Sequence, residues 1–373
     1  MGSKLGGHAE SQVPDRFARD AGAALGKFAI GGLFLHLPAL LRCPWLCSIG
    51  TELSAWPTSL IGPNADSEEG EMQTEILLEP GSLAEAVDQR TRQALAEGIL
   101  LPIETEQERI TDAGVHFLVR VIASLRRKGV ETGLRAVGGQ GRPANPFLPP
   151  EPELTVAEVS THHLAVLNKF SVLDRHLLIV TRAFEHQETL LTPGDLRALF
   201  ACMAEYPSLG FYNGGTVAGA SQPHKHLQVV PLPLEPDGPA IPMEPLLDAR
   251  GRGRVGHCPG LPFAHAFARF DRPIVAAPME AAKQAAVLYP GLLAAVGIKE
   301  VESGGELRQS APYNLLVADD WMLVVPRVEE CFRGVSVNAL GFAGSIFVKD
   351  RTQIGVIRAP GPMYMLQVVA GSA

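Results

Sequence analysis

The sequence predicts an α+β protein built on an antiparallel sheet. Candidate strands and helices are mixed along the chain without the regular strand–helix–strand alternation of a parallel sheet. A hairpin is predicted at Tyr313–Arg327, where two apolar runs flank the turn Ala318-Asp319-Asp320. The chain has 373 residues, of which 46% are hydrophobic and 19% are charged. A large core is therefore available, and wholesale disorder is excluded.

The remaining elements are predicted from local patterns, taken in chain order. Ser82 and Glu85 have the spacing of a capping box, which predicts a helix through Ala96. Prolines make 145–150 a rigid, extended connection. A proline in the first turn predicts a helix at Pro193–Glu205. Strands are expected at 115–122, 161–170, 176–181 and 210–213, a loop at 235–262, a helix at 280–288, and closing segments at 338–347 and 363–369.

Residues 1–71 form an N-terminal extension that differs from the rest of the chain. Basic residues precede an apolar run from Phe28 to Leu41, which is typical of a targeting segment. The run is short for a membrane span, begins late and is interrupted by glycine and proline. Met72 opens sequence that leads directly into the first predicted helix. A misassigned start, a disordered extension and a structured piece are therefore the alternatives to targeting.

Charge and cysteine content exclude several classes of protein. The formal net charge is −8, and there is no long basic run, which argues against nucleic acid as the main partner. The five cysteines are scattered and include no CxxC pair, so neither a secreted disulfide framework nor a zinc ribbon is indicated. We expect a cytoplasmic protein without a membrane partner, or an organellar one if the extension is a targeting segment.

The strongest functional signal is the run Gly219-Ala220-Ser221-Gln222-Pro223-His224-Lys225-His226-Leu227-Gln228. Alternate side chains of a strand share one face, so His224, His226 and Gln228 would form a row. The small, polar residues before the row can approach a phosphate closely. Two histidines at this spacing could instead chelate zinc, but glutamine is a poor third ligand and no metal site is predicted. Two ordinary histidines are the other alternative.

A neutral imidazole in this row can attack the α-phosphorus of a nucleotide and form a phosphoramidate. The middle residue, His226, is best placed to attack, with one ring nitrogen free and the other held by an acceptor. His224 and Gln228 would flank it and donate hydrogen bonds. A polyphosphate leaves as a stable anion, so positioning and charge stabilisation would supply most of the rate. No cofactor is required, although Mg²⁺ can accompany the nucleotide.

Several segments together resemble a known family. The run from His224 to Val230 resembles the histidine-triad superfamily, in the branch of nucleotidylyltransferases where glutamine replaces the third histidine. The three-histidine form is typical of hydrolases. Further similar segments are Asn145–Pro149, Leu167–Phe170, Tyr313–Leu316, Trp321–Arg327 and Asn338–Ser345. From Met72 onwards the chain is similar to diadenosine tetraphosphate (Ap4A) phosphorylases, also called ATP adenylyltransferases.

The resemblance implies a fold, a reaction and a set of site residues. The fold is an antiparallel sheet with packed helices, as in histidine-triad proteins and galactose-1-phosphate uridylyltransferase. One catalytic domain would span 72–373, with the motif in about 72–240 and a completing part in about 300–373. Phosphate would split Ap4A into ADP and ATP through an adenylylated histidine. The implied catalytic residues are His226, His224 and Gln228, and the implied substrate-binding residues are Lys128, Asn168, Lys169, Asn213, Gly219, Ala220, Ser221, Gln222, Asn314, Met322 and Arg327.

Other interpretations are kept beside this one. A hexose-1-phosphate uridylyltransferase is the nearest alternative enzyme, but the cysteine and histidine pattern of its structural metal is not evident. A nucleotide-binding sensor without turnover is the second, and the intact His226 and Gln228 argue against it. For Met322 the alternative is plain core packing, and for Arg327 it is a surface ion pair. The remaining clustered histidines, His162, His163, His176 and His186, are left outside the catalytic set, and His176 is expected to pack against its strand neighbours.

Overall fold

The computed structural model describes residues 75–122, 145–248 and 251–372. The chain divides into two units, Met1–Ala65 and Asp66–Ala373, and all described residues belong to the second. The predicted extension over residues 1–71 and the predicted site residue Lys128 lie outside the described residues. Within the described ranges, no helix combines the length and the apolar character needed to cross a membrane.

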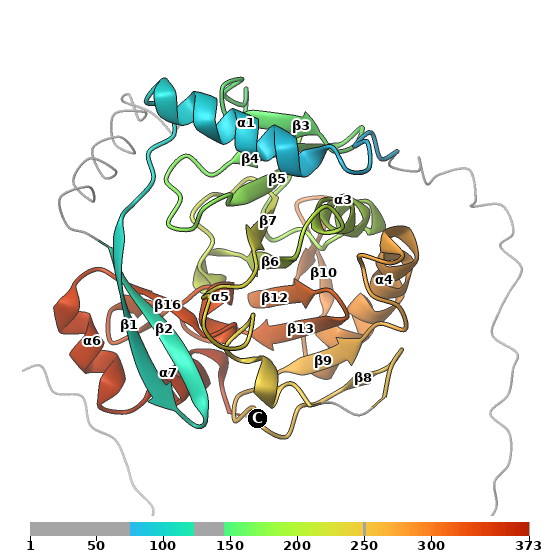
Figure 1. Cartoon of the computed structure of the whole chain (residues 1–373). Coiled ribbons are helices and arrows are strands. Elements are labelled where there is room, and N and C mark those ends of the chain that lie inside the picture. Colours follow the sequence, from blue (N-terminus) through green and yellow to red (C-terminus); the bar gives the residue numbers. More distant parts are fainter. Residues whose placement is uncertain (1–74, 123–144, 249–250, 373) are drawn as a thin grey trace, which may run out of the picture. The chain divides into compact units, whose positions relative to one another are not determined.

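A nine-stranded antiparallel sheet forms the centre of the second unit (Figure 1). Its strands lie in the order β3-β4-β5-β7-β6-β12-β13-β9-β8. The first five to appear in the chain are β3 (Thr155–Glu158), β4 (His163–Leu167), β5 (Leu177–Thr181), β6 (Ser208–Gly214) and β7 (His226–Pro231). The others are β8 (Val255–Gly256), β9 (Ala266–Arg269), β12 (Tyr313–Ala318) and β13 (Trp321–Pro326). The predicted hairpin is β12–β13, and β12 also pairs with β6, so both halves of the unit share one sheet.

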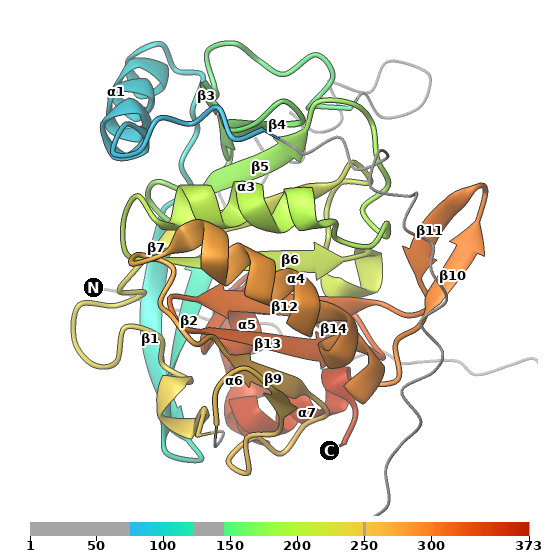
Figure 2. The same ribbon diagram turned by 90° about the vertical axis from the view of Figure 1, so that its right-hand side faces the viewer.

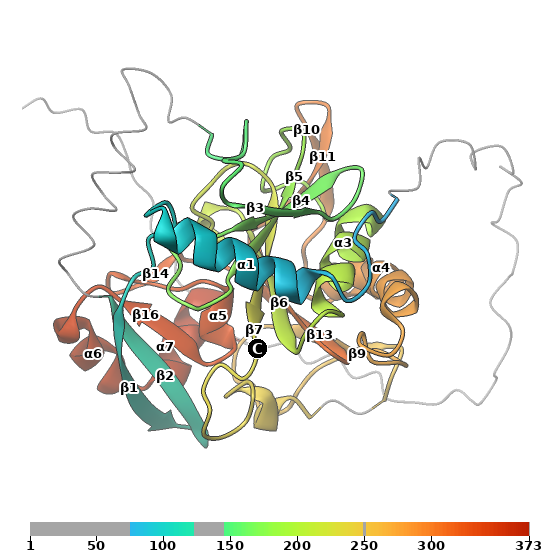
Figure 3. The same cartoon turned by 45° about the horizontal axis from the view of Figure 1, so that its top comes forward.

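Helices and a second sheet cover the two faces of this sheet. Helices α3 (Pro193–Met203) and α4 (Pro278–Ala295) cover one face (Figure 2), and α1 (Leu83–Ala96) lies along β3 (Figure 3). The other face carries α5 (Ala339–Phe342), α6 (Arg351–Arg358), α7 (Pro362–Ala370) and a sheet of β1 (Thr105–Asp112), β2 (Val115–Ile122) and β16 (Ser345–Val348). Two small hairpins, β10 (Glu300–Ser303) with β11 (Glu306–Gln309) and β14 (Cys331–Phe332) with β15 (Val335–Ser336), complete the unit. The predicted α+β class with an antiparallel sheet is confirmed.

Strand alternation divides the core into two parts and decides where the predicted row faces. Leu227 and Val229 of β7 enter the core beneath α3 and α4. Val230 enters the second core, on the side of α5, α7 and β16. His226 and Gln228 share the side of Val230, because successive side chains of a strand point to opposite faces. The functional row therefore faces the C-terminal helices rather than α3 and α4.

The start of α1 corrects one local prediction. Ser82 makes no side-chain capping bond, and the carboxylate of Glu205 accepts the backbone N–H of Leu83 instead, at 2.9 Å. A capping box does occur at α3, where Thr192 and Asp195 bond each other's backbone N–H groups. A carboxylate from a distant part of the chain satisfies the same orphan donors as a local cap, and local spacing cannot reveal it.

Candidate active site

A cavity of about 500 Å³ opens beside His226 and Gln228. Its apolar lining includes Phe147, Leu154, Val166, Phe170 and Leu178. Its polar lining includes eight predicted site residues, namely Asn168, Lys169, Asn213, Gly219, Ser221, Gln222, His226 and Gln228, together with His176 and Asn338. The cavity thus combines an apolar surface suited to a nucleobase ring with polar groups suited to a phosphate.

His226, the first residue of β7, has one occupied and one free ring nitrogen. Its Nδ1–H donates to the carbonyl oxygen of His224 at 2.7 Å, which leaves Nε2 as the atom with the lone pair. No other described residue hydrogen bonds to Nε2. Burial lowers the pKa of His226 to about 4, so the ring is neutral at neutral pH. This is the state that a nucleophilic imidazole requires.

The backbone of His226 is held by a side chain that the sequence did not indicate. The side-chain amide of Gln187 lies between the ends of β6 and β7, where ladder pairing stops after Phe211 and Gln228. Its Oε1 accepts the N–H of His226 at 2.9 Å. Its Nε2 donates to the carbonyl oxygens of Asn213 at 2.9 Å and His226 at 3.2 Å. The Gln187 amide takes the place of direct backbone hydrogen bonds between Asn213 of β6 and His226 of β7. It therefore fixes the position of the His226 backbone.

His176 packs against a strand neighbour, Phe211, as expected, and it also contacts the predicted site. It lines the cavity, and its Nε2 lies 2.9 Å from Oε1 of Gln228. Burial lowers the pKa of His176 to about 4. Leu178 pairs directly with Gln228, so His176 is the diagonal neighbour of Gln228 across the two strands. Only the register of β5 against β7 brings these side chains together, and the sequence does not display that register.

Asn314 and Arg327 lie behind the cavity instead of lining it. Asn314 Nδ2 donates to Oδ1 of Asn213 at 2.8 Å, and Arg327 Nη1 donates to Oδ1 of Asn314 at 2.7 Å. Asn213 Oδ1 also accepts the N–H of Ala339 at 3.0 Å. Asn213 Nδ2 has no partner among the described residues, and Asn213 lines the cavity. The buried pair therefore orients the Asn213 amide with its N–H groups towards the cavity.

His224 does not reach the cavity, contrary to the expectation of a three-residue row. It is fully buried and precedes β7. Its Nε2 donates to the carbonyl oxygen of Thr181 at 2.9 Å, and its Nδ1 accepts from Asn145 Nδ2 at 3.0 Å. Both nitrogens are therefore engaged, and the His224 side chain cannot donate to a phosphate. Its carbonyl group contributes instead, by holding the ring of His226.

Two further predicted residues lie outside this cavity. Met322 is buried in the core beneath α3 and α4, on the opposite face of the sheet from His226. This corrects its placement in the site and agrees with the alternative of core packing. Ala220 lines a separate cavity of about 200 Å³, which shares Ser221 and Gln222 with the larger one.

The loop before β7 needs glycine where it passes α5. Gly219 has a φ of +90°, and a Cβ there would lie 2.8 Å from Cβ of Asn338. Both the left-handed backbone and the close approach exclude larger residues.

On another side of the cavity, Lys169 Nζ lies 2.8 Å from the carboxylate of Glu151. Lys169 is thus held at the lining with its charge partly exposed.

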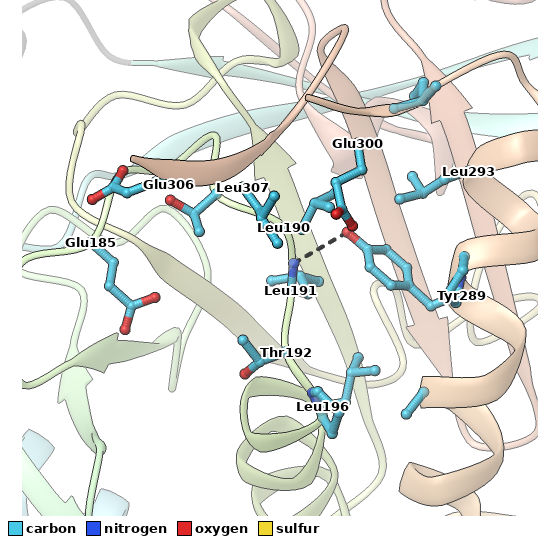
Figure 4. A pocket seen from close by; sticks show the side chains of 15 residues that line it. Glu185, Leu190, Leu191, Thr192, Leu196, Tyr289, Leu293, Glu300, Glu306 and Leu307 are labelled. Carbon is cyan, nitrogen blue, oxygen red and sulfur yellow. Dashed lines mark hydrogen bonds between the residues drawn. The ribbon is translucent and has the colours of Figure 1, made fainter. Parts of the chain in front are cut away.

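A larger cavity, of about 640 Å³, does not suit a phosphate chain. It lies between α3, α4 and the β10–β11 hairpin, and Figure 4 shows Leu190, Leu191 and Leu196 beside Tyr289. The charged side chains in its lining are glutamates, Glu185, Glu300 and Glu306, which repel an anionic ligand. It also lies on the face that His226 turns away from. The smaller cavity is therefore the candidate active site.

The lowered pKa values predict how the site responds to acid. Burial moves the pKa of His226, like that of His176, from 6.5 to about 4. We expect the rate of nucleophilic attack by His226 to be flat from about pH 8 to pH 6 and to fall as pH approaches 4, because a protonated ring has no lone pair to attack. Rapid-quench measurement of the formation of a covalent intermediate across this range would test the expectation.

The same two groups should also destabilise the fold in acid. Between pH 6.5 and about 4 the unfolded chain binds more protons than the native protein, so the free energy of unfolding falls as pH falls through this window.

The rate measurement has its own contradicting outcome. If the rate of attack by His226 drops below pH 7 with an ordinary histidine pKa, the ring is not buried and neutral as described.

Comparison with known proteins supports the fold and shows the family. The family model of the Ap4A phosphorylase N-terminal domain matches residues 73–249, and that of the ATP adenylyltransferase C-terminal domain matches residues 259–372. Diadenosine 5′,5‴-P1,P4-tetraphosphate phosphorylase 2 of Saccharomyces cerevisiae is 30% identical over 241 residues, covering 56% of this chain and 70% of the yeast protein. Protein APA1 of the same yeast is 27% identical over 302 residues, covering 73% of this chain and 88% of that protein. The crystal structure of yeast Ap4A phosphorylase Apa2 has a TM-score of 0.62 and 24% identity, covering 79% of this chain and 99% of that chain.

These matches define the chain as a nucleotidyltransferase. The antiparallel sheet agrees with that class, and so does the free imidazole nitrogen beside a cavity with apolar and polar lining. The chain belongs to the family of Ap4A phosphorylases, or ATP adenylyltransferases.

Proposed function

We propose that this enzyme catalyses the phosphorolysis of Ap4A to ADP and ATP, with His226 as the adenylylated residue. The observation that carries the proposal is the His226 ring, which is neutral, held through Nδ1 and free at Nε2 beside a cavity of about 500 Å³. The family membership supports the choice of substrate, since a yeast relative at 30% identity is an Ap4A phosphorylase.

The first step transfers AMP to the enzyme. The Nε2 lone pair of His226 attacks the α-phosphorus of one adenosine, the bond from phosphorus to the bridging oxygen breaks, and ATP leaves with the bonding electrons. The ring gains positive charge, which its Nδ1–H bond to the His224 carbonyl stabilises. In the second step a phosphate oxygen attacks the same phosphorus, the nitrogen–phosphorus bond breaks, and ADP leaves a neutral imidazole.

The lining supports specific contacts for the bound nucleotide. The apolar residues around Phe147 and Phe170 provide a surface for adenine. The amides of Asn213 and Gln228, with the hydroxyl of Ser221, would donate to the oxygens of the reacting phosphate. Lys169 would attract the polyphosphate, and Asn168 would contact the nucleotide at the same wall.

We also propose that the enzyme needs no resident cofactor. The nucleophile is the imidazole itself, and the leaving polyphosphate is a stable anion. Mg²⁺ can accompany the nucleotide, since it binds polyphosphate oxygens and the reaction takes place on a nucleotide polyphosphate. A cytoplasmic location fits this role, and an organellar one applies if residues 1–71 act as a targeting segment.

Product analysis with and without phosphate tests the proposed function. Incubation with Ap4A and phosphate should yield ADP and ATP in equal amounts, since the adenylyl group ends on phosphate. Formation of AMP and ATP at the same rate without phosphate would instead make the protein a hydrolase. A parallel incubation with a UDP-sugar separates the uridylyltransferase alternative, and Ap4A binding without any product would identify a sensor.

A further inference from the structure

A chain of hydrogen bonds runs from the backbone N–H of Phe170 to the side chain of Gln228, and in each bond the earlier group is the donor. The backbone N–H of Phe170 donates to Oδ1 of Asn168 at 3.3 Å, and a backbone N–H can only donate. Asn168 therefore presents Nδ2 to His176 Nδ1, at 3.1 Å. His176 then carries its proton on Nε2 and donates to Oε1 of Gln228, at 2.9 Å. The starting donor thus fixes the orientation of every later group in the chain.

The last link leaves one end of the Gln228 amide available. Its oxygen is occupied by His176, whereas its nitrogen has no hydrogen-bond partner in the described part of the chain. Gln228 is 8% exposed and lines the cavity, so its two N–H groups are directed at the space beside His226. An amide turned the other way would present its oxygen to a phosphate and repel it. The direction of this amide therefore matters to any anion in the cavity.

Asn213 shows the same arrangement on the neighbouring strand. Its oxygen is occupied by Asn314 and by the Ala339 N–H, and no described residue hydrogen bonds to its nitrogen. Phe211 pairs with Gln228, so Asn213 and His226 are the next residues of β6 and β7 on this face. Two amide nitrogens of fixed orientation therefore flank the nucleophile.

We propose that His176 is a positioning residue for adenylyl transfer, which acts by holding the Gln228 amide with its N–H groups towards the phosphoryl oxygens. The inference rests on the proposed function of His226 and extends it to a residue of a different strand. His176 needs only a donor at the position of Nε2 for this role. The ring is neutral and donates through that atom without taking part in bond making.

Two substitutions separate the donor from the ring. His176→Phe keeps an aromatic ring and removes the donor, and we expect kcat for Ap4A phosphorolysis to fall by about 10- to 100-fold, at or below the cost of losing a transition-state donor itself, with KM changed less than about 3-fold. His176→Gln places an amide N–H near the position of Nε2 and should restore most of the lost kcat. His116→Phe, at an exposed histidine of β2, is the matched control and should leave kcat unchanged.

A double-mutant cycle tests whether His176 acts through Gln228. In a Gln228→Ala background there is no amide to orient, so adding His176→Phe should lower kcat by less than about 2-fold. If His176→Phe lowers kcat by the same factor in both backgrounds, His176 acts independently of Gln228 and the proposal fails. Failure of His176→Gln to recover activity, with an intact fold, would also overturn it.

A measurement without substrate keeps this inference separate from the proposed function. Nitrogen-15 spectra of histidine-labelled protein, with the His176 signals assigned by their loss in His176→Phe, report which ring nitrogen carries the proton. We predict the neutral form protonated at Nε2. The form protonated at Nδ1 would overturn the positioning role even in an active enzyme. The predicted form in a protein that does not turn over Ap4A would leave the hydrogen-bond chain supported and the substrate proposal wrong.

Discussion

Replacement of His226 by alanine is expected to lower kcat for Ap4A phosphorolysis by at least about 1,000-fold, because a covalent nucleophile contributes more than any single binding contact. Among the described residues, no other neutral imidazole presents a free nitrogen to the cavity. His224 has both nitrogens engaged with Thr181 and Asn145, and Nε2 of His176 is bound to Gln228. Steady-state assays of ADP and ATP formation measure the loss.

Loss of folding must be separated from loss of the nucleophile in this variant. Removing the His226 imidazole leaves only a small polar gap at the cavity wall, so the unfolding transition of His226→Ala should remain cooperative. His162→Ala, at an exposed histidine, is the matched control and should keep its full kcat. If His226→Ala keeps more than about a hundredth of the wild-type kcat, His226 is not the adenylylated residue.

Replacement of Arg327 by methionine is expected to lower the free energy of unfolding by about 3–5 kcal/mol, since it leaves two buried acceptors, Asn314 Oδ1 and the carbonyl oxygen of Val337, without a donor, at about 1–3 kcal/mol each. Arg327 is 3% exposed, and burial lowers its pKa to about 10, so it remains charged at neutral pH. Its guanidinium also lies over the ring of Phe342. It donates to the backbone oxygens of Glu329, Glu330, Val337 and Val369 and to Oδ1 of Asn314.

Urea unfolding followed by circular dichroism would measure this change. Methionine retains most of the apolar stem, so the loss reports the missing donors rather than a large cavity. Arg272→Met, at an exposed arginine, is the control and should change stability by less than about 0.5 kcal/mol. An equally small effect in Arg327→Met would show that the buried guanidinium does not tie β13 to α7 and to Asn314.

The sequence predicted the sheet and the central residues of the site because both depend on local patterns. Alternation placed His226 and Gln228 on one face of β7, and the apolar hairpin at β12–β13 is present. The glycine-rich loop before β7 reaches the cavity through Gly219 and Ser221, as expected.

What the sequence could not provide depends on contacts between distant segments. The strand alternation does not reach His224, since β7 begins two residues later, at His226, and the His224 ring is bound by Thr181 and Asn145. His176 and Gln187 reach the site only through the pairing of strands and the folding of the loop between β5 and α3. Long-range register has no local signature.

Intact-mass analysis after incubation with Ap4A in the absence of phosphate tests the central claim most directly. Without an acceptor the first step should stop at the adenylylated enzyme, with ATP released. We predict an added mass of one AMP per chain, lost on mild acid treatment or on addition of phosphate with formation of ADP, and located at His226 by peptide mapping. An unmodified mass in enzyme that converts Ap4A once phosphate is added, or the same adduct in His226→Ala, would contradict the proposed mechanism.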